Sequence, residues 1–332
     1  MLNAVFVDWL TASQYHFEGG LPIITGGVIV HYDESGVPRY ERNCPASFPG
    51  SYDTSLRIGC DGFRVSVSGN VGRFARQDNL YNFGWEGTKE AVNRILQSIG
   101  LPSFSVSTGE QIHQDTPWRS RGAVVSRLDV TANYATGSEA RARACIRHMA
   151  ARSVARMKKG RAGDESVWWA NTRHMLKAYI KHLEMAAHGT RCDDQAYLWC
   201  LYEGVVRVEL ELKKRLLSEL KLNDWGDITQ EKLEDVYRTQ TELLRALDLS
   251  DDEILMENIP IRSRVYAAAW LAGRDMAAMA NVRTLYRHAK ILREHGIDIF
   301  AERENVKQFP TQVRFIDLVQ LSVPDWYKKR SA

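Results

Sequence analysis

The sequence lacks the short motifs that mark several common enzyme families. There is no GxxxxGK[ST] loop for a nucleoside triphosphate, and no GxGxxG turn for a dinucleotide. HExxH and GxSxG are also absent, and none of the nine histidines forms a His-x-His pair. These absences argue against ATP hydrolysis and against the chemistry of the zinc proteases.

Cysteine and long apolar runs are scarce as well. The five cysteines are scattered, odd in number and without a CxxC pair, which favours free thiols in a reducing compartment over a disulfide framework or a zinc module. No window approaches the roughly 18–20 apolar residues that span a bilayer, and the start, MLNAVFVDWLTAS, does not resemble a signal peptide. We therefore expect a cytoplasmic globular protein with no membrane partner.

Charge is balanced over the whole chain but not locally. The sequence has 44 Lys and Arg against 41 Asp and Glu, whereas the segment 141–161 has eight basic residues and no acidic one. We expect this segment to be a helix, either one with a solvated basic face or one that neutralises nucleic-acid phosphates. A membrane-surface helix ranks last, because the apolar arc is small and has no Trp or Phe.

Two patterns divide the chain. Residues 1–215 contain short β-branched and aromatic runs, and GVVRVELELKK alternates strictly between apolar and polar residues, which is typical of an antiparallel sheet with one face on a core. Residues 216–305 have helical spacing, and 263–296 resembles a helix-turn-helix. Residues 306–332 include a final strand that we expect to rejoin the sheet. The predicted fold class is α+β.

Polar residues that could take part in catalysis or metal binding lie in three predicted strands: SRLDVT, AYIKHLE and VRVELE. Arg127 and Asp129 share one polar face, and Arg207 and Glu209 share another. If the strands are neighbours, these four side chains converge. Spacing alone favours cross-strand salt bridges, each worth roughly 0.2–1 kcal/mol. The alternative is a carboxylate site for a hard cation such as Mg²⁺ or Mn²⁺.

Tyr179, in the same group of predicted strands, is a candidate nucleophile. On a strand it shares a face with Lys177 and Lys181. A free tyrosine has a pKa of about 10, so the phenolate costs about 4 kcal/mol at pH 7, and adjacent cations lower that pKa. We expect such a lowered pKa here if Tyr179 is a nucleophile, although most strand tyrosines only pack.

Four blocks carry a resemblance to a known family. They are SRLDVTANY, MLKAYIKHLEM, GVVRVELELKKRLL and VRFIDLVQLSVPDWY, spread over residues 126–327. In order and separation they resemble the gene II-type replication initiators of filamentous bacteriophages (inoviruses), and most of all those of the Pf-type phages of Pseudomonas. The first 125 residues match more loosely, through VSVSGNVGRF and DNLYNFG.

The resemblance implies an HUH-like nicking domain and rolling-circle replication. Such proteins nick the plus strand at a double-stranded origin, hold the 5′ end on a tyrosine and later religate it. Tyr179 matches that tyrosine, and Lys181 would stabilise the phenolate or the phosphate. Because the covalent link to the tyrosine conserves the energy of the broken phosphodiester bond, religation needs no ATP. This agrees with the missing nucleotide-binding loop. The implied partners are double- and single-stranded origin DNA, a host helicase and a host polymerase.

The wider group of rolling-circle initiators holds its metal with a His-hydrophobic-His pair, which this sequence does not have. We instead assign Mg²⁺ or Mn²⁺ to Asp129, Glu184 and Glu209, the acidic members of three blocks. Glu184 would need a bulge to reach the face of Tyr179, because it has the wrong parity on a regular strand. His182 is an alternative ligand, or a structural histidine.

Basic residues of the blocks and helices become predicted DNA contacts in this context. The segment 141–161 would grip phosphates, and the later helices would reach base edges. The predicted contacts are Arg127, Arg147, Arg152, Lys158, Lys159, Arg207, Arg283 and Arg287. Two other functions stay open: a non-catalytic origin-binding repressor, and a nuclease that uses metal-activated water. A second tyrosine, Tyr134 or Tyr202, is a possible assistant.

Overall fold

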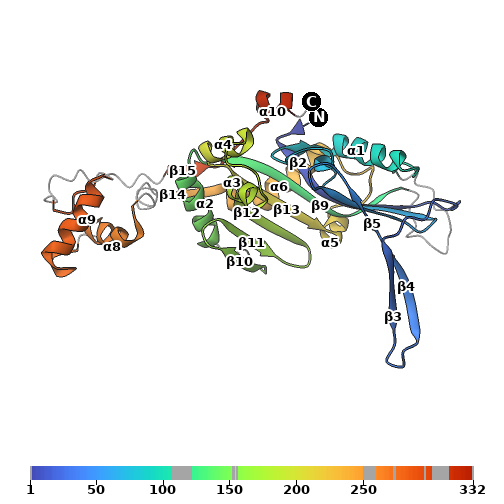
Figure 1. The fold of residues 1–332 in the computed structure, drawn as a ribbon, viewed down its shortest axis with the longest axis horizontal. Helices are drawn as coiled ribbons and strands as arrows, with labels where there is room; N and C mark the ends of the chain where they lie inside the picture. Colours follow the sequence, from blue (N-terminus) through green and yellow to red (C-terminus); the bar gives the residue numbers. More distant parts are fainter. Residues whose placement is uncertain are drawn as a thin grey trace.

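One large antiparallel sheet organises the molecule in the computed structural model (Figure 1). The structure describes residues 2–106, 122–151, 154, 156–249, 259–271, 274–294, 297–300 and 314–330. Ten strands form the sheet in the order β10-β11-β12-β13-β9-β2-β7-β6-β5, and β16 also pairs with β9. The three strands predicted to carry chemistry are thus direct neighbours: β12, β13 and β9.

The strands of the large sheet are β2 (Val5–Tyr15), β5 (Ala46–Pro49), β6 (Ser55–Cys60), β7 (Arg64–Gly69), β9 (Val124–Ala135), β10 (Lys158–Ala162), β11 (Ser166–Ala170), β12 (His174–Ile180), β13 (Val206–Lys213) and β16 (Val319–Gln320). Three two-stranded sheets pair β1 (Leu2–Asn3) with β8 (Asn82–Phe83), β3 (Gly27–Tyr32) with β4 (Pro38–Cys44), and β14 (Ala246–Leu249) with β15 (Arg314–Asp317). The helices are α1 (Trp85–Ser98), α2 (Glu139–Ala151), α3 (Lys181–Ala187), α4 (Gln195–Tyr202), α5 (Lys214–Glu219), α6 (Gln230–Arg245), α8 (Ile261–Leu271), α9 (Val282–Glu294) and α10 (Asp325–Arg330), with short 3₁₀ turns η1 (Val71–Arg73) and η2 (Met276–Ala278).

The alternation in β13 decides which face of the sheet is core. Val206, Val208, Leu210 and Leu212 are all fully buried, and they pack into one apolar cluster with side chains of α1, α2, α5 and α6. Each such side chain contributes roughly 1.5–3 kcal/mol through burial. The polar residues between them consequently point to the opposite face, as a period of two requires.

A smaller apolar cluster covers part of that opposite face. Phe6 of β2 packs there with Tyr81, with Met185 of α3, with Cys200 of α4 and with Tyr327 of α10. Tyr81 lies edge-on to both Phe6 and Tyr327, with ring centroids 6.1 and 5.5 Å apart. These helices therefore cover the part of the polar face around Phe6, whose ring centre lies 5.4 Å from the guanidinium of Arg207.

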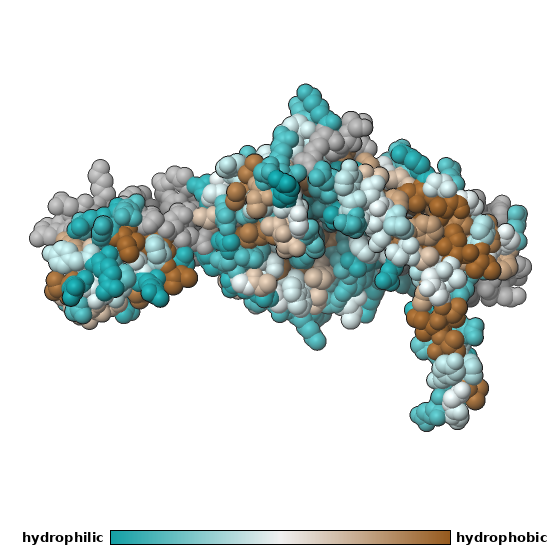
Figure 2. Space-filling model, viewed as in Figure 1, coloured by the Kyte–Doolittle hydropathy of each residue, from teal (hydrophilic) through white to brown (hydrophobic). Residues whose placement is uncertain are grey.

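The strands β3 and β4 form a hairpin that projects from the sheet (Figure 1). Several of its apolar residues are solvent-exposed, among them Val28, Tyr32, Val37 and Tyr40, and Figure 2 shows hydrophobic residues along it. The rings of His31 and Tyr40 stack across the hairpin with centroids 4.1 Å apart.

The α+β class with an antiparallel sheet is confirmed, but the long basic helix is wrong. α2 ends at Ala151, and Lys158–Ala162 form the edge strand β10, paired with β11. Gly160 suits this strand, because a Cβ there would collide with the ring of Trp168 on β11.

The helices beyond residue 215 pack in two groups. Leu216, Leu233 and Leu244 of α5 and α6 belong to the core of the large sheet. Helices α8 and α9 have their own apolar cluster, which includes Ala267, Leu285 and other residues between 259 and 299. The C-terminal segment rejoins the large sheet through β16, where Val319 pairs with Ala135.

Of the helices within the described ranges, none combines the length and the apolar content that crossing a membrane requires.

Candidate functional site

Tyr179 is the penultimate residue of β12 and points to the face opposite the main core. Its backbone pairs with Arg207 of β13, and Lys177 pairs with Glu209. Because residues paired across an antiparallel ladder share a face, these four side chains lie together. Only 5% of Tyr179 is exposed, so its surroundings, rather than bulk water, determine its chemistry.

The hydroxyl of Tyr179 donates a hydrogen bond to Glu209. Tyr179 Oη lies 2.5 Å from Glu209 Oε1. Lys177 Nζ lies 3.8 Å from the other carboxylate oxygen and 4.4 Å from the centre of the tyrosine ring. A nucleophile and a base within hydrogen-bond reach, with the base held by a third group, is the arrangement that activates a hydroxyl.

The expected lowering of the Tyr179 pKa is wrong. Burial and the charge of Glu209 raise the pKa of Tyr179 well above 10, and Arg207 opposes them only in part. Burial and the charge of Asp8 likewise raise the pKa of Glu209. The carboxylate is therefore a stronger base than a free glutamate, which suits it to accept the tyrosine proton during a reaction.

Lys181 and Glu184 lie on a helix that follows β12, which the sequence pattern did not predict. β12 ends at Ile180 and α3 begins at Lys181, so the strand parity that separated Glu184 from Tyr179 no longer applies. Lys181 Nζ donates to Glu184 Oε2 at 2.6 Å and to Asn79 Oδ1 at 3.0 Å. Burial opposes ionisation of Glu184, but Lys181 and Arg207 outweigh it and lower the pKa of Glu184.

Arg207 is completely buried and not a surface contact. Its Nε donates to Asn133 Oδ1 at 2.9 Å, and its Nη2 donates to the carbonyls of Asn79 and Leu80. Burial disfavours the charge, yet Tyr179, Asp8 and nearby carboxylates raise the pKa of Arg207. Among the described atoms, Arg207 Nη1 has no hydrogen-bond partner. The residue thus supplies a fixed positive charge with one uncommitted donor.

Asp8 is a member of this cluster that sequence reasoning missed. It sits at a bulge of β2, where the register against β9 shifts between Val7 and Trp9. The side-chain amides of Asn70 and Asn79 donate to its Oδ1 at 2.8 and 3.1 Å. The sequence feature that could have indicated Asp8 is a single acid inside the apolar run VFVDWL. The face that its side chain takes depends on the bulge.

Asp129 lies further along the same face, in a separate ion-pair group. Arg127 donates to both of its carboxylate oxygens, at 2.9 and 2.7 Å, and lies 3.2 Å from Glu211. The partner of Asp129 across the ladder is Glu211, not Glu209. Burial raises the pKa of Asp129 to about 7 despite Arg127. Arg127–Glu211 is a cross-strand salt bridge of the kind that spacing alone favoured, whereas Arg127–Asp129 lies within one strand.

Of the three predicted metal ligands, Asp129 and Glu209 share a face of the sheet and Glu184 lies on α3. Each of the three has its own cation. Over the described ranges, no cluster of three or more His, Cys, Asp and Glu has the geometry to hold a metal ion. The best oxygen set is Glu209 and Asp8, whose charges repel each other. The hydroxyl of Thr131, which pairs with Glu209 across the ladder, is buried and has no hydrogen-bond partner among the described atoms. His182 packs edge-on to Tyr197, away from this set of contacts.

The predicted phosphate grip on 141–161 is weakened by acids from outside the segment. Arg143 contacts Glu139 and Asp164 at 2.8 Å, and Arg147 lies 3.6 Å from Asp164. Lys158 and Lys159 lie on β10, where Lys159 Nζ donates to the carbonyl of Ala150. Arg152 lies outside the described residues. In contrast, Arg283 and Arg287 are exposed on α9, opposite its buried Leu285 and Ala289.

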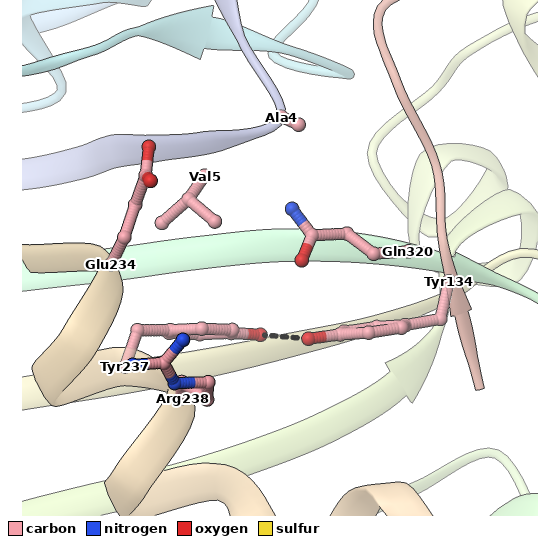
Figure 3. Close-up of a pocket in the computed structure, with 7 residues that line it drawn as sticks. All are labelled: Ala4, Val5, Tyr134, Glu234, Tyr237, Arg238 and Gln320. Atoms are coloured by element: carbon pink, nitrogen blue, oxygen red, sulfur yellow. Dashed lines mark hydrogen bonds between the residues drawn. The ribbon is translucent and has the colours of Figure 1, made fainter. Parts of the chain in front are cut away.

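A cavity of about 300 Å³ lies on the other side of the sheet (Figure 3). It is lined by Tyr134 and Tyr237, whose hydroxyls are 3.3 Å apart, and by Glu234, Arg238 and Gln320 among others. Tyr134 belongs to the main apolar core. Neither this cavity nor Tyr134 is therefore part of the Tyr179 site. The other candidate assistant, Tyr202, is 72% exposed on α4.

Comparison with known proteins places these features in a family. Residues 7–231 match the family model for the N-terminal part of the gene II replication-associated protein, and residues 258–332 match the model for its C-terminal part. The replication-associated protein of this type from Escherichia phage If1 is 27% identical over 321 residues, covering 83% of this chain and 98% of the relative. That of Enterobacteria phage I2-2 is 27% identical over 165 residues, 47% of each chain. The N-terminal match covers more than half of the chain and contains Asp8, Tyr179 and Glu209, and so the protein belongs to the family of gene II-type replication-associated proteins of filamentous phages.

Proposed function

We propose that this protein initiates rolling-circle replication by nicking the plus strand of a phage origin with Tyr179. The observation that carries the proposal is the 2.5 Å hydrogen bond from Tyr179 to Glu209 in a cluster of cations. The sheet would then be an HUH-like nicking domain that works without the histidine pair. It would act in the host cytoplasm and leave a 3′-OH for a host polymerase, beside a host helicase.

The nicking step balances with the groups in the cluster. Tyr179 Oη forms a bond to the scissile phosphorus as the hydroxyl proton passes to Glu209. The bond from phosphorus to the 3′ oxygen breaks, and the leaving oxygen takes a proton from solvent. Arg207 and Lys181 offset the negative charge that develops. The reverse attack by a 3′-OH on the phosphotyrosine religates the strand and returns the proton to Tyr179, so no ATP is needed.

Mg²⁺ or Mn²⁺ would take the oxygen donors next to Tyr179 as ligands. The ion would be held by Asp8, by the hydroxyl of Thr131 and by Glu209 Oε2, the carboxylate oxygen that does not accept from Tyr179. Magnesium commonly uses one or two carboxylates and keeps several waters. This ligand set replaces Asp129 and Glu184, because Arg127 and Lys181 donate to those acids at 2.6–2.9 Å, whereas the lysine beside Glu209, Lys177, lies 3.8 Å away. When bound, the ion would polarise the phosphate oxygens.

Detection of a covalent adduct tests this function. Supercoiled DNA with the phage origin is incubated with the protein and Mg²⁺ or Mn²⁺, denatured, and digested with trypsin. We expect a 5′-phosphate linkage on the peptide that contains Tyr179. Origin DNA that is shifted but never cut would indicate a repressor, and cutting without an adduct would indicate a nuclease that uses activated water.

Replacement of Glu209 by glutamine separates the proposed base from its structural role. The amide keeps a hydrogen-bond partner for Tyr179 but cannot take the proton, so we expect nicking to fall by about 10²–10⁴-fold, the usual contribution of general base catalysis. The measurement is the initial rate of supercoiled-to-open-circle conversion. Glu211→Gln, two residues along the same face, is the matched control and should nick at close to the wild-type rate. Equal rates for the two variants would remove Glu209 from the mechanism.

Helix α9 is the proposed contact with the origin duplex. Arg283, Arg287 and Lys290 lie on its exposed face, while Leu285 and Ala289 anchor the other. An α-helix fits the major groove of B-DNA. We expect Arg283→Ala/Arg287→Ala to weaken binding to duplex origin DNA by about 10-fold or more, with a shallower salt dependence because two phosphate or base contacts are lost.

Gel shifts over a range of salt concentrations measure this effect. The control is Arg262→Ala/Arg274→Ala, which removes two exposed arginines from the same unit but not from α9. Equal loss in both double variants would mean that only the net charge of the unit matters, and that α9 has no special role.

A further inference from the structure

The polar face that holds Tyr179 continues across the sheet beyond β9. Asp129 pairs with Trp9 of β2, Thr11 of β2 pairs with Ser68 of β7, and Ser68 pairs in turn with Arg57 of β6. Paired residues share a face, so this ladder carries one surface from the Tyr179 site to β6. Neighbouring strands are about 4.8 Å apart, and four steps from β13 to β6 make roughly 19 Å.

The far part of this surface is made of small hydroxyl side chains with arginines at its border. We call it the serine face: Thr11 and Ser13 of β2, Ser66 and Ser68 of β7, with Arg64 and Arg57. The large apolar residues of the same strands, such as Leu10, Val67 and Ile58, are buried on the other side. The alternation thus leaves a flat, polar strip.

Helices do not roof this strip in the described part of the chain. The apolar cluster that covers the Tyr179 end includes Phe6 of β2 but no residue of β6 or β7. Arg57 and Arg64 are both solvent-exposed, and Arg64 is held at the surface by a 2.8 Å hydrogen bond from its Nη2 to Ser13 Oγ. Figure 1 shows α3 and α4 beside β12, at a distance from β5.

Charge and aromatic rings on the serine face suit one class of partner. The six residues that define this face include two arginines and no acid. Aromatic rings stand at both ends: Trp9, with the Arg127 guanidinium 5.1 Å from its ring centre, and Tyr15, stacked on Phe63 at 6.0 Å. Phe63 is 45% exposed. Cations that follow a backbone, with rings for unstacked bases, are the features that bind single-stranded nucleic acid.

We propose that the serine face binds the single-stranded DNA next to the scissile phosphate, an inference that rests on the proposed function. Arg57 and Arg64 contact phosphates, and bases stack on Tyr15 and Phe63. The hydroxyl side chains let the backbone of the strand approach the sheet. A duplex fits less well, because its bases are already stacked on each other and have no face for these rings.

Binding measurements without catalysis test the proposal. All proteins have the Tyr179→Phe change, so that no DNA is cut, and a fluorescent single-stranded oligonucleotide is titrated while its anisotropy is followed. We expect Arg57→Ala/Arg64→Ala to raise the Kd by about 10-fold and to reduce the salt slope by about 1.4, since each lost phosphate contact removes about 0.7 for a single strand. Arg94→Ala/Arg215→Ala, two exposed arginines of α1 and α5, should change neither value.

Photo-crosslinking gives a second, positional readout. An oligonucleotide with 5-iodouracil should crosslink to the peptides that contain Tyr15 and Phe63, and Tyr15→Ala should remove its crosslink. Unchanged affinity and salt slope in Arg57→Ala/Arg64→Ala, in a protein that melts like its parent, would overturn the proposal, and so would a loss confined to duplex DNA. Failure of the nicking function itself would appear separately, as a wild-type protein that forms no adduct while still binding the oligonucleotide.

Discussion

A Tyr179→Phe protein is expected to lose origin nicking by at least about 10⁴-fold while it still binds origin DNA. Phenylalanine fills the same space but has no oxygen to attack phosphorus, and removal of a covalent nucleophile is among the most damaging changes an enzyme can suffer. The measurements are open-circle formation and the covalent adduct, both of which should fall below detection.

The controls for Tyr179→Phe come from the rest of the chain. Tyr202→Phe removes an exposed hydroxyl nearby in sequence and should nick normally. Stability needs its own check, because the change removes the 2.5 Å hydrogen bond to the partly buried Glu209, which is worth roughly 0.5–1.5 kcal/mol, or about 1.5–3 kcal/mol where the carboxylate is charged. A folded Tyr179→Phe protein that nicks at the wild-type rate would refute Tyr179 as the nucleophile.

The sheet and the location of the site were predictable because both depend on local patterns. Strict alternation in GVVRVELELKK determines which side chains face the core, and the structure buries Val206, Val208, Leu210 and Leu212 as that pattern requires. Once β12, β13 and β9 pair, Tyr179 and Glu209 must share a face. The resemblance added the proposed role of Tyr179 as nucleophile, which alternation cannot supply, and the proposed role of Glu209 as base comes from its hydrogen bond with Tyr179.

The remaining features depend on contacts that no local pattern encodes. Asp8 joins the site only because β2 has a bulge, and Glu184 only because β12 turns into α3 after Ile180. The basic segment looked free because the acids that pair with it, Glu139 and Asp164, lie outside it. The pKa of Tyr179 was misjudged for a related reason: counting nearby lysines ignores burial, which is the largest influence on it.

Replacement of Leu210 by aspartate is expected to destabilise the protein by about 4 kcal/mol or more. Leu210 is fully buried in the main core, where the variant would place a carboxylate without a partner and leave apolar neighbours unfilled. Thermal or urea unfolding measures the loss. Its neighbour Glu209 faces the other side of the strand, so Glu209→Gln should lower the nicking rate by about 10²–10⁴-fold yet melt close to wild type.

Leu210→Met distinguishes the destabilisation caused by a buried charge from that caused by a changed side-chain shape at this position. Methionine has a similar volume and stays apolar, so it should cost less than about 1.5 kcal/mol. The two faces of β13 then make opposite predictions at adjacent positions: changes at 210 act through stability, and changes at 209 act through chemistry. A Leu210→Asp protein that unfolds like wild type would mean that the strand faces the other way. In that case Glu209 would point into the core and could not serve Tyr179.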